Sequence, residues 1–219
     1  MQVISRSFAP QDLVSGHAAL DLVNTVTARN TPSPLDWLDG YSRVLEWARL
    51  AGVVESGALT LLQRRAAADN PKAEAAVARL KDFRELLHTA YTTLIRGERV
   101  PEPALKQLVK IWDEARGRLD LEYRDRRVEL RTDIDRSGLD LVRDCLADGA
   151  ITLLLQLPND RVRICRGERC GWLFVDSSKG AQRVWCDMAT CGNAAKSRRH
   201  LKNVQQRRRR RGARNTGSS

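Results

Sequence analysis

The sequence predicts a mainly α-helical fold: a helical N-terminal domain with a small β-hairpin insert, then a small cysteine module that ends in a basic helix. Three observations predict it. Apolar residues recur every three or four positions through most of residues 1–158, two short segments alternate with period two, and four of the five cysteines lie between Cys165 and Cys191. We therefore expect a helical body (residues 1–158), a cysteine module (159–210) and a disordered basic tail (211–219).

Proline and glycine positions bound the helices expected in the body. A short apolar cluster at residues 20–26 comes first, after Gly16. The expected helices cover about residues 34–52, 56–68, 71–97, 103 onward and 139–157. Their apolar stripes, together with Trp37, Trp47 and Trp112, are expected to form one core.

Residues 119–132 interrupt the helical pattern. Leu119–Tyr123 and Val128–Thr132 alternate apolar and polar residues, and four charged residues lie between them. This pattern predicts a β-hairpin set into the helical body. A further short strand is expected at 161–164, directly before the first clustered cysteine.

Composition favours a globular chain. Apolar residues make up 42% of the 219 residues, and no apolar run approaches the roughly 20 residues that a membrane span needs. The N-terminal residues lack a signal-peptide pattern, so we expect a cytoplasmic protein, in a compartment where disulfides are rare.

The net charge of +11 is concentrated at one end. Residues 1–164 carry 24 Lys/Arg and 24 Asp/Glu, whereas residues 165–219 carry 14 Lys/Arg and 3 Asp/Glu. A neutral body with a strongly basic tail favours a polyanionic partner. An anionic membrane surface is a weaker alternative, because the tail has almost no apolar face to bury.

The clustered cysteines have metal-site spacing. Four residues separate Cys165 from Cys170 and Cys186 from Cys191, and fifteen separate the two pairs. Four thiolates can close a tetrahedron around one Zn²⁺ and leave no open position, so we expect a structural zinc. Two disulfides, or four unconnected thiols, are the alternatives. The fifth cysteine, Cys145, is expected to be a buried apolar residue.

A module of this size needs such a metal, because it cannot bury enough apolar surface alone. The order of a cysteine pair, a short hairpin carrying Trp172 and Phe174, a second pair and a helix looks like a treble-clef zinc finger with four cysteine ligands. Asn193 is expected to cap a helix that runs from about residue 194 to 208.

That helix concentrates positive charge, since no acidic residue follows Asp187. We expect it to lie in a nucleic-acid groove, with Lys and Arg contacting phosphates and with Asn193, Gln205, Gln206 and one or two of the arginines reaching bases. The residues expected to contact nucleic acid are Arg183, Asn193, Lys196, Arg198, Arg199, Lys202, Arg207 and Arg208.

Two segments resemble known families. Cys170-Gly171-Trp172-Leu173-Phe174, Arg183-Val184-Trp185-Cys186 and Cys191-Gly192-Asn193 are similar to the CGNR zinc-finger family over about residues 160–208. Gly16, Leu20–Thr25 and Trp47–Gly52 resemble the ABATE domain that usually accompanies it. The resemblance implies a stress-linked bacterial transcription regulator whose N-terminal domain senses a ligand or partner. Val184 departs from the family, which often has a second arginine there.

Asp21, Asn24 and Thr25 stand at i, i+3 and i+4, so a helix would place them on one polar edge, which Arg29 could extend. This edge is a candidate site for a small-molecule effector. The alternative is a hydrogen-bond network that orders the domain.

Three functions are compatible with these patterns. The leading hypothesis is a zinc-containing, DNA-binding transcription regulator, whose helical domain binds a ligand or forms a homodimer. An RNA- or ribosome-associated zinc protein is the alternative, because phosphate contacts do not separate DNA from RNA. An enzyme is disfavoured: Asp12, Asp21, His17 and His88 are available acids and bases, but no nucleophile motif, phosphate loop or open metal site accompanies them.

Overall fold

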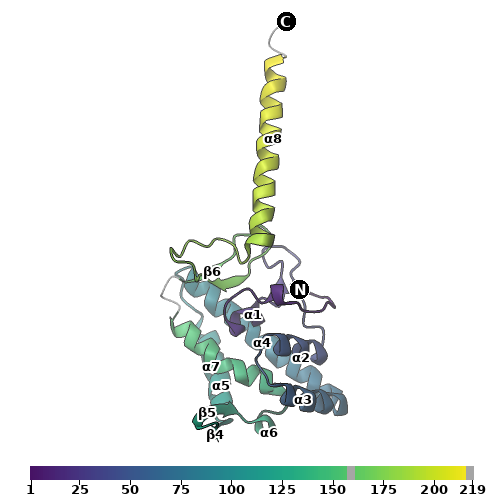
Figure 1. Ribbon diagram of the computed structural model, residues 1–219, viewed down its shortest axis with the longest axis vertical. Coiled ribbons are helices and arrows are strands. Elements are labelled where there is room, and N and C mark those ends of the chain that lie inside the picture. The colour runs from purple at the N-terminus through teal and green to yellow at the C-terminus, as the bar shows by residue number, and fades with distance from the viewer. Residues whose placement is uncertain (157–160, 216–219) are drawn as a thin grey trace.

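The computed structural model describes residues 1–156 and 161–215, and it describes side chains as far as residue 206. The body is a bundle of helices, the cysteine module sits on one end of it, and helix α8 projects from the module as a long rod (Figure 1). The β4–β5 hairpin lies at the opposite end of the body from α8 (Figure 1). None of the described helices is both long and apolar enough to cross a membrane.

The body contains the predicted helices and a small sheet. Its helices are α1 (Ala18–Val23), α2 (Tyr41–Leu50), α3 (Ser56–Ala68), α4 (Asn70–Ile95), α5 (Glu102–Arg116), α6 (Ile134–Ser137) and α7 (Leu141–Gln156). Its strands are β1 (Gln2–Val3), β2 (Val26–Thr27), β3 (Leu35–Asp36), β4 (Leu119–Arg124) and β5 (Arg127–Thr132). Strands β1, β3 and β2 form a three-stranded sheet in that order, and β4 pairs with β5 antiparallel.

The prediction that a helix begins near residue 34 is wrong. Leu35 and Asp36 are extended in β3, and helix α2 begins only at Tyr41. Asp36 explains the difference: its buried carboxylate accepts two hydrogen bonds from Arg84 of α4, at 2.7 and 3.0 Å, and one from the backbone N–H of Leu38. A tertiary ion pair therefore overrides the local helical pattern.

The helical stripes meet in one core. Trp47, Phe83, Leu87 and Tyr91 are fully buried there, and Tyr91 donates its hydroxyl hydrogen to the carbonyl of Ala150 at 2.8 Å. Each buried large side chain contributes roughly 1.5–3 kcal/mol to the stability of this core. Two tryptophans expected in this core differ: Trp112 is only partly buried, and Trp37 packs on the cysteine module.

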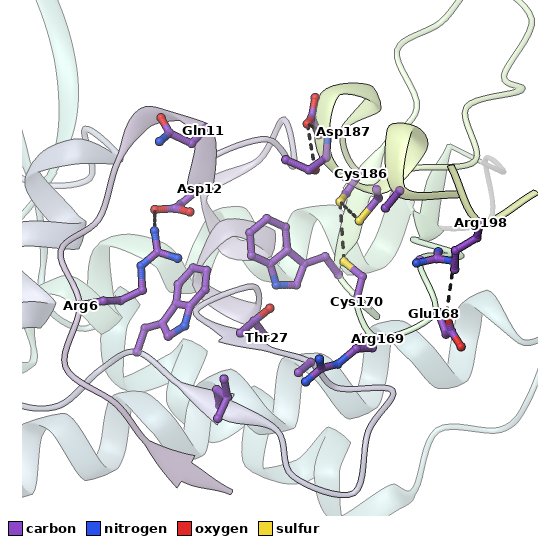
Figure 2. Close-up of a pocket in the computed structure, with 18 residues that line it drawn as sticks. Arg6, Gln11, Asp12, Thr27, Glu168, Arg169, Cys170, Cys186, Asp187 and Arg198 are labelled. Carbon is purple, nitrogen blue, oxygen red and sulfur yellow. Dashed lines mark hydrogen bonds and ion pairs between the residues drawn. The ribbon is translucent and has the colours of Figure 1, made fainter. Parts of the chain in front are cut away.

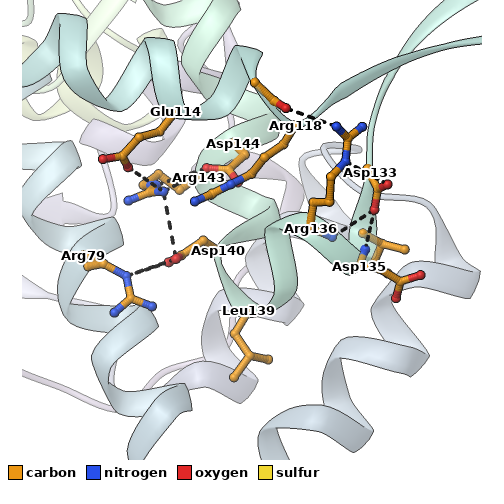
Figure 3. A network of polar contacts seen from close by, with 12 residues as sticks. Arg79, Glu114, Arg118, Asp133, Asp135, Arg136, Leu139, Asp140, Arg143 and Asp144 are labelled. Atoms are coloured by element: carbon orange, nitrogen blue, oxygen red, sulfur yellow. Dashed lines mark hydrogen bonds and ion pairs between the residues drawn. The ribbon is translucent and has the colours of Figure 1, made fainter.

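A polar network joins α4, α7 and the base of the hairpin (Figure 3). Arg79 of α4 contacts Asp140 at 2.9 Å, and Arg118, just before β4, contacts the buried carboxylate of Asp144 at 2.6 Å. Arg143 also donates to Asp144, at 3.0 Å. These pairs fix the base of the hairpin on α7.

The cysteine module consists of strands β6 (Val162–Ile164) and β7 (Leu173–Val175), a π-helical turn (Met188–Gly192) and helix α8 (Asn193–Asn215). Strands β6 and β7 pair antiparallel, and the first cysteine pair forms the turn between them. The expected order of cysteine pair and then hairpin is therefore corrected: the first pair lies inside the hairpin. Helix α8 continues past the expected end at residue 208, so residues 211–215, expected to be disordered, are helical.

Candidate metal centre and nucleic-acid interface

The four predicted cysteine ligands converge on one point. The sulfur atoms of Cys165, Cys170, Cys186 and Cys191 all lie within 4.8 Å of one another, and no disulfide joins them. The Cys170–Cys186 and Cys186–Cys191 sulfurs are each 3.7 Å apart. A tetrahedral ion with Zn–S bonds of about 2.3 Å requires sulfur separations of about 3.8 Å. The four side chains therefore fit a closed, four-coordinate thiolate metal site.

Glycines allow the first cysteine turn to close. A Cβ on Gly167 would lie 2.9 Å from the Cys191 sulfur and 2.9 Å from Cβ of Cys170, too close for any side chain. The backbone N–H of Gly167 instead points at the Cys165 sulfur, at 3.4 Å. Gly171 has φ of +73°, a left-handed conformation that favours glycine, and returns the chain into β7.

The four cysteine side chains shift one another's pKa, and a bound cation would stabilise their ionised forms together. Hydrogen bonds from Cys170 and Cys186 lower the pKa of Cys165. Hydrogen bonding to Cys165 raises the pKa of Cys170, and burial raises the pKa of Cys191. Four sulfurs this close cannot all be thiolates unless a positive ion lies between them.

Arg183 and Asp176 brace the second cysteine pair. The Arg183 guanidinium donates to the carbonyls of Trp185 and Cys186 and lies 4.6 Å from the centre of the Phe174 ring. The buried carboxylate of Asp176 accepts from the backbone N–H of Arg183 at 2.7 Å. Arg183 was expected to contact phosphate; the structure instead places its guanidinium against backbone carbonyls of its own module.

Helix α8 continues directly from the π-helical turn that carries Cys191. The side chain of Asp187 accepts from the backbone N–H of Thr190 at 2.8 Å and caps this turn. The expectation that Asn193 caps the helix is therefore wrong, because the helical run begins five residues earlier. The exposed Asn193 side chain donates to the carbonyl of Ala189 at 3.1 Å.

The predicted phosphate-contacting residues of α8 have different environments. Lys196, Arg199 and Lys202 are exposed, whereas Arg198 forms an ion pair with Glu168 at 3.3 Å. The side chains of Arg207 and Arg208 lie outside the described side chains. Within the described part of α8, three lysine or arginine side chains thus extend into solvent from a helix that is anchored at the metal site.

The predicted polar edge of the body faces the cysteine module. The Asn24 side chain donates to the Leu173 carbonyl at 2.8 Å and accepts from the Leu173 N–H at 2.9 Å, so it pairs with β7 as a neighbouring strand would. Asp21 accepts from the N–H of Ser15 at 3.1 Å, and the carbonyl of Ser15 accepts from the N–H of Val175 at 2.7 Å. Sequence reasoning found these residues but not this contact.

The other two residues of this edge bind groups of the body. Thr25 donates to the Leu22 carbonyl and accepts from Arg84, and Arg29 makes a two-pronged ion pair with Glu85 at 2.9 and 3.1 Å. All four side chains are therefore engaged by protein groups. The geometry favours an ordering network, and effector binding by these four residues stays a prediction.

A cavity of about 560 Å³ lies where the body, the cysteine pairs and the first turns of α8 meet (Figure 2). Arg6 and Thr27 line it from the body, Cys170 and Arg169 from the first cysteine turn, and Arg198 from α8. Arg6 pairs with Asp12 at 2.8 Å on one side of the cavity, and Arg198 pairs with Glu168 on the other (Figure 2). Sequence reasoning missed this cavity, because its walls come from distant segments.

Comparisons with known proteins agree with this geometry. The family model described as "Putative stress-induced transcription regulator", ABATE, matches residues 16–156, and the model described as "CGNR zinc finger" matches residues 161–211. No curated protein matches the chain.

Proposed function

The chain belongs to the ABATE family and carries a CGNR zinc finger, and on this basis we propose that it is a zinc-containing, DNA-binding transcription regulator. One observation carries the proposal: a helix with exposed Lys196, Arg199 and Lys202 is anchored by the turn that precedes it to a four-cysteine site. The metal would be Zn²⁺ in a structural role, held by Cys165, Cys170, Cys186 and Cys191.

The anchoring matters because phosphate contacts require charges at fixed positions. Cys191 lies in the π-helical turn that continues into α8, so the metal site holds the first turn of the helix. Phosphates on both walls of a groove could then be contacted from one helix. If α8 neutralises about five to eight phosphates, log K should fall with log salt with a slope of roughly −5 to −7 on duplex DNA.

An RNA- or ribosome-associated zinc protein that uses the same basic helix is the alternative, and the burial of the aromatic residues argues against one mode of it, the binding of RNA by base stacking. Trp172 and Phe174 are 9% and 0% exposed, in contact with Trp37 and the metal ligands. Neither ring is free to stack on an unpaired base, which is how single-stranded RNA is usually bound.

The test is the salt dependence of binding to random-sequence duplex DNA, measured by fluorescence anisotropy with the metal-loaded protein. A variant with Lys196, Arg199 and Lys202 changed to alanine should bind more weakly and lose about three units of salt slope, one per phosphate contact. The control variant changes Arg64, Lys72 and Lys110, three exposed residues of α3, α4 and α5, and removes the same charge.

Three results would count against the proposal. The two triple variants could lose affinity equally, which would mean that net charge alone drives binding. Chelation of the metal could leave affinity unchanged. Single-stranded RNA could compete better than duplex DNA of equal length, which would favour the RNA alternative.

We propose that a small-molecule effector, if one acts on this protein, binds in the cavity where the body, the cysteine pairs and α8 meet, rather than at the polar edge of the body. Its volume of about 560 Å³ falls in the range of ligand sites, roughly 300–1,000 Å³, and it borders both the body and α8. Ala194→Phe would place a ring at the α8 wall of this cavity. If an effector binds there, this variant should lose the thermal stabilisation that the effector gives to the wild-type protein.

A further inference from the structure

The β4–β5 hairpin exposes its apolar face and turns its polar face inward. Leu121, Tyr123, Val128 and Leu130 form the apolar face and are 73%, 73%, 66% and 60% exposed. Leu121 pairs across the strands with Leu130, and Tyr123 with Val128, so the four side chains form one continuous surface. We call this surface the hairpin face.

The opposite side of the hairpin carries charged residues and faces the body. Glu122, Glu129 and Arg131 are each less exposed than the hairpin face and line a cavity of about 940 Å³ against the start of α3. Arg131 forms ion pairs with Glu55 of that segment and with Glu129. A hairpin on a globular body normally buries its apolar side, so here the alternation is reversed.

The turn and the base of the hairpin fix this arrangement. Asp125 and Arg126 have φ of 47° and 65°, the pair of left-handed residues that a tight two-residue hairpin turn requires. At the other end, the N–H of Asp133 donates to the carbonyl of Arg118 at 2.8 Å. A one-residue slip would reverse the two faces but would break both ends, so the outward apolar face belongs to the folded chain.

The size and chemistry of the hairpin face decide what could cover it. No residue of the face is charged, so a polyanion such as nucleic acid gains nothing there. Four such side chains expose on the order of 250–500 Å². A second copy of the same face would bring the total to roughly 500–1,000 Å², which suits a weak dimer rather than a permanent one. Sheet faces of this kind pack on each other about 10 Å apart.

We propose that the hairpin face is a homodimer interface, in which Leu121, Tyr123, Val128 and Leu130 of one copy pack against the same residues of a second copy about a two-fold axis. The interface is isologous, so each residue acts twice and one substitution disrupts two contacts. Tyr123 anchors it, because its ring supplies the largest area of the four side chains and its hydroxyl can stay in water at the rim. This proposal is independent of nucleic-acid binding.

Analytical ultracentrifugation of the full, metal-loaded chain tests it, over protein concentrations of about 1 to 100 µM, the range in which a weak dimer forms and dissociates. The wild-type protein should change from monomer to dimer within that range. Leu121→Glu and Leu130→Glu place a charge in the apolar interface, and each should weaken dimerisation at least about tenfold. Val3→Glu is the matched control, because Val3 is 51% exposed on β1, outside the hairpin.

The glutamate variants should keep the thermal unfolding temperature of the wild-type monomer, since both positions are exposed. If either one fails to fold, Tyr123→Ser removes the anchor without adding charge and should also weaken the dimer. A wild-type protein that stays monomeric at every concentration overturns the proposal, as does a dimer that the hairpin variants leave intact. A monomer whose DNA affinity falls in Leu121→Glu overturns it too, and would assign the face to nucleic acid. The α8 triple variant should still dimerise, which separates this proposal from the DNA-binding one.

Discussion

Replacing Asn24 with alanine should loosen the cysteine module from the body. Asn24 is 1% exposed, and its side-chain amide satisfies both backbone hydrogen-bonding groups of Leu173 in β7. Alanine would leave a buried N–H and a buried C=O of Leu173 without partners. Each unsatisfied buried group costs about 1–3 kcal/mol, so the variant should lose about 2–5 kcal/mol of unfolding free energy.

Asn24→Asp sharpens this test because it removes only the donor. A carboxylate can still accept from the Leu173 N–H, but it would face the Leu173 carbonyl, which now lies 2.8 Å from the amide nitrogen. We expect a loss at least as large as that of alanine at pH 7, since a buried charge is added. Asn193→Ala is the control, because Asn193 is exposed and contacts only the preceding turn.

The assay is urea unfolding followed by tryptophan fluorescence, with metal release measured along the same titration using a chromophoric chelator. We expect metal to be released at lower urea concentration in both Asn24 variants than in the control. A destabilisation of Asn24→Ala below about 0.5 kcal/mol, the range of ordinary surface substitutions, would refute it. Stability lost without any change in effector response would also remove Asn24 from a sensing role.

Three further predictions follow from single contacts. Gly167→Ala should lower metal affinity at least about tenfold in a chelator competition, because its Cβ would lie 2.9 Å from the Cys191 sulfur, whereas Gly180→Ala should not. Burial raises the pKa of Asp21 to about 6, so its ionised form weakens the fold as pH rises from about 4 through 6. Asp21→Asn should therefore raise the unfolding free energy by about 1–2 kcal/mol at pH 7.5 and by little at pH 4, as measured in urea. Arg84→Met should cost about 3–5 kcal/mol in the same assay, because it leaves the buried Asp36 carboxylate with one partner fewer, and Asp36→Asn, which removes the charge but can still accept from the Leu38 N–H, should restore part of that loss in the double variant.

The features that sequence predicted well depend on local patterns. The helix at residues 56–68 and the hairpin at 119–132 have the predicted limits, because apolar periodicity and turn residues determine both. The gathering of four cysteine sulfurs within reach of one ion was also predictable, because two short-spaced cysteine pairs are typical of such a site.

The features that sequence missed depend on contacts between distant residues. Asn24 and Leu173 are 149 positions apart, so the polar spacing around Asn24 indicated a functional edge but not its partner. Arg183 looked like one more basic residue, yet the Phe174 ring and two carbonyls hold its guanidinium. The alternating pattern predicted the hairpin but not which face it turns outward, because that depends on how the base of the hairpin is held on α7, where Arg118 contacts Asp144.

The body and the cysteine module are separate segments of the sequence, but they share their buried cores. Val162 and Leu173 of the module are buried in the main helical core, and Trp37 of the body packs edge-on against Trp172, 5.7 Å away, in the cluster around the metal ligands. A module with its own core could lose its metal and leave the body unchanged. Here the strands that carry the first cysteine pair also complete the core of the body, so loss of the metal should lower the unfolding temperature of the whole chain. The same contacts join the body to the base of α8, because Asn24 binds β7 directly after Cys170 and Cys191 lies in the turn from which the helix begins.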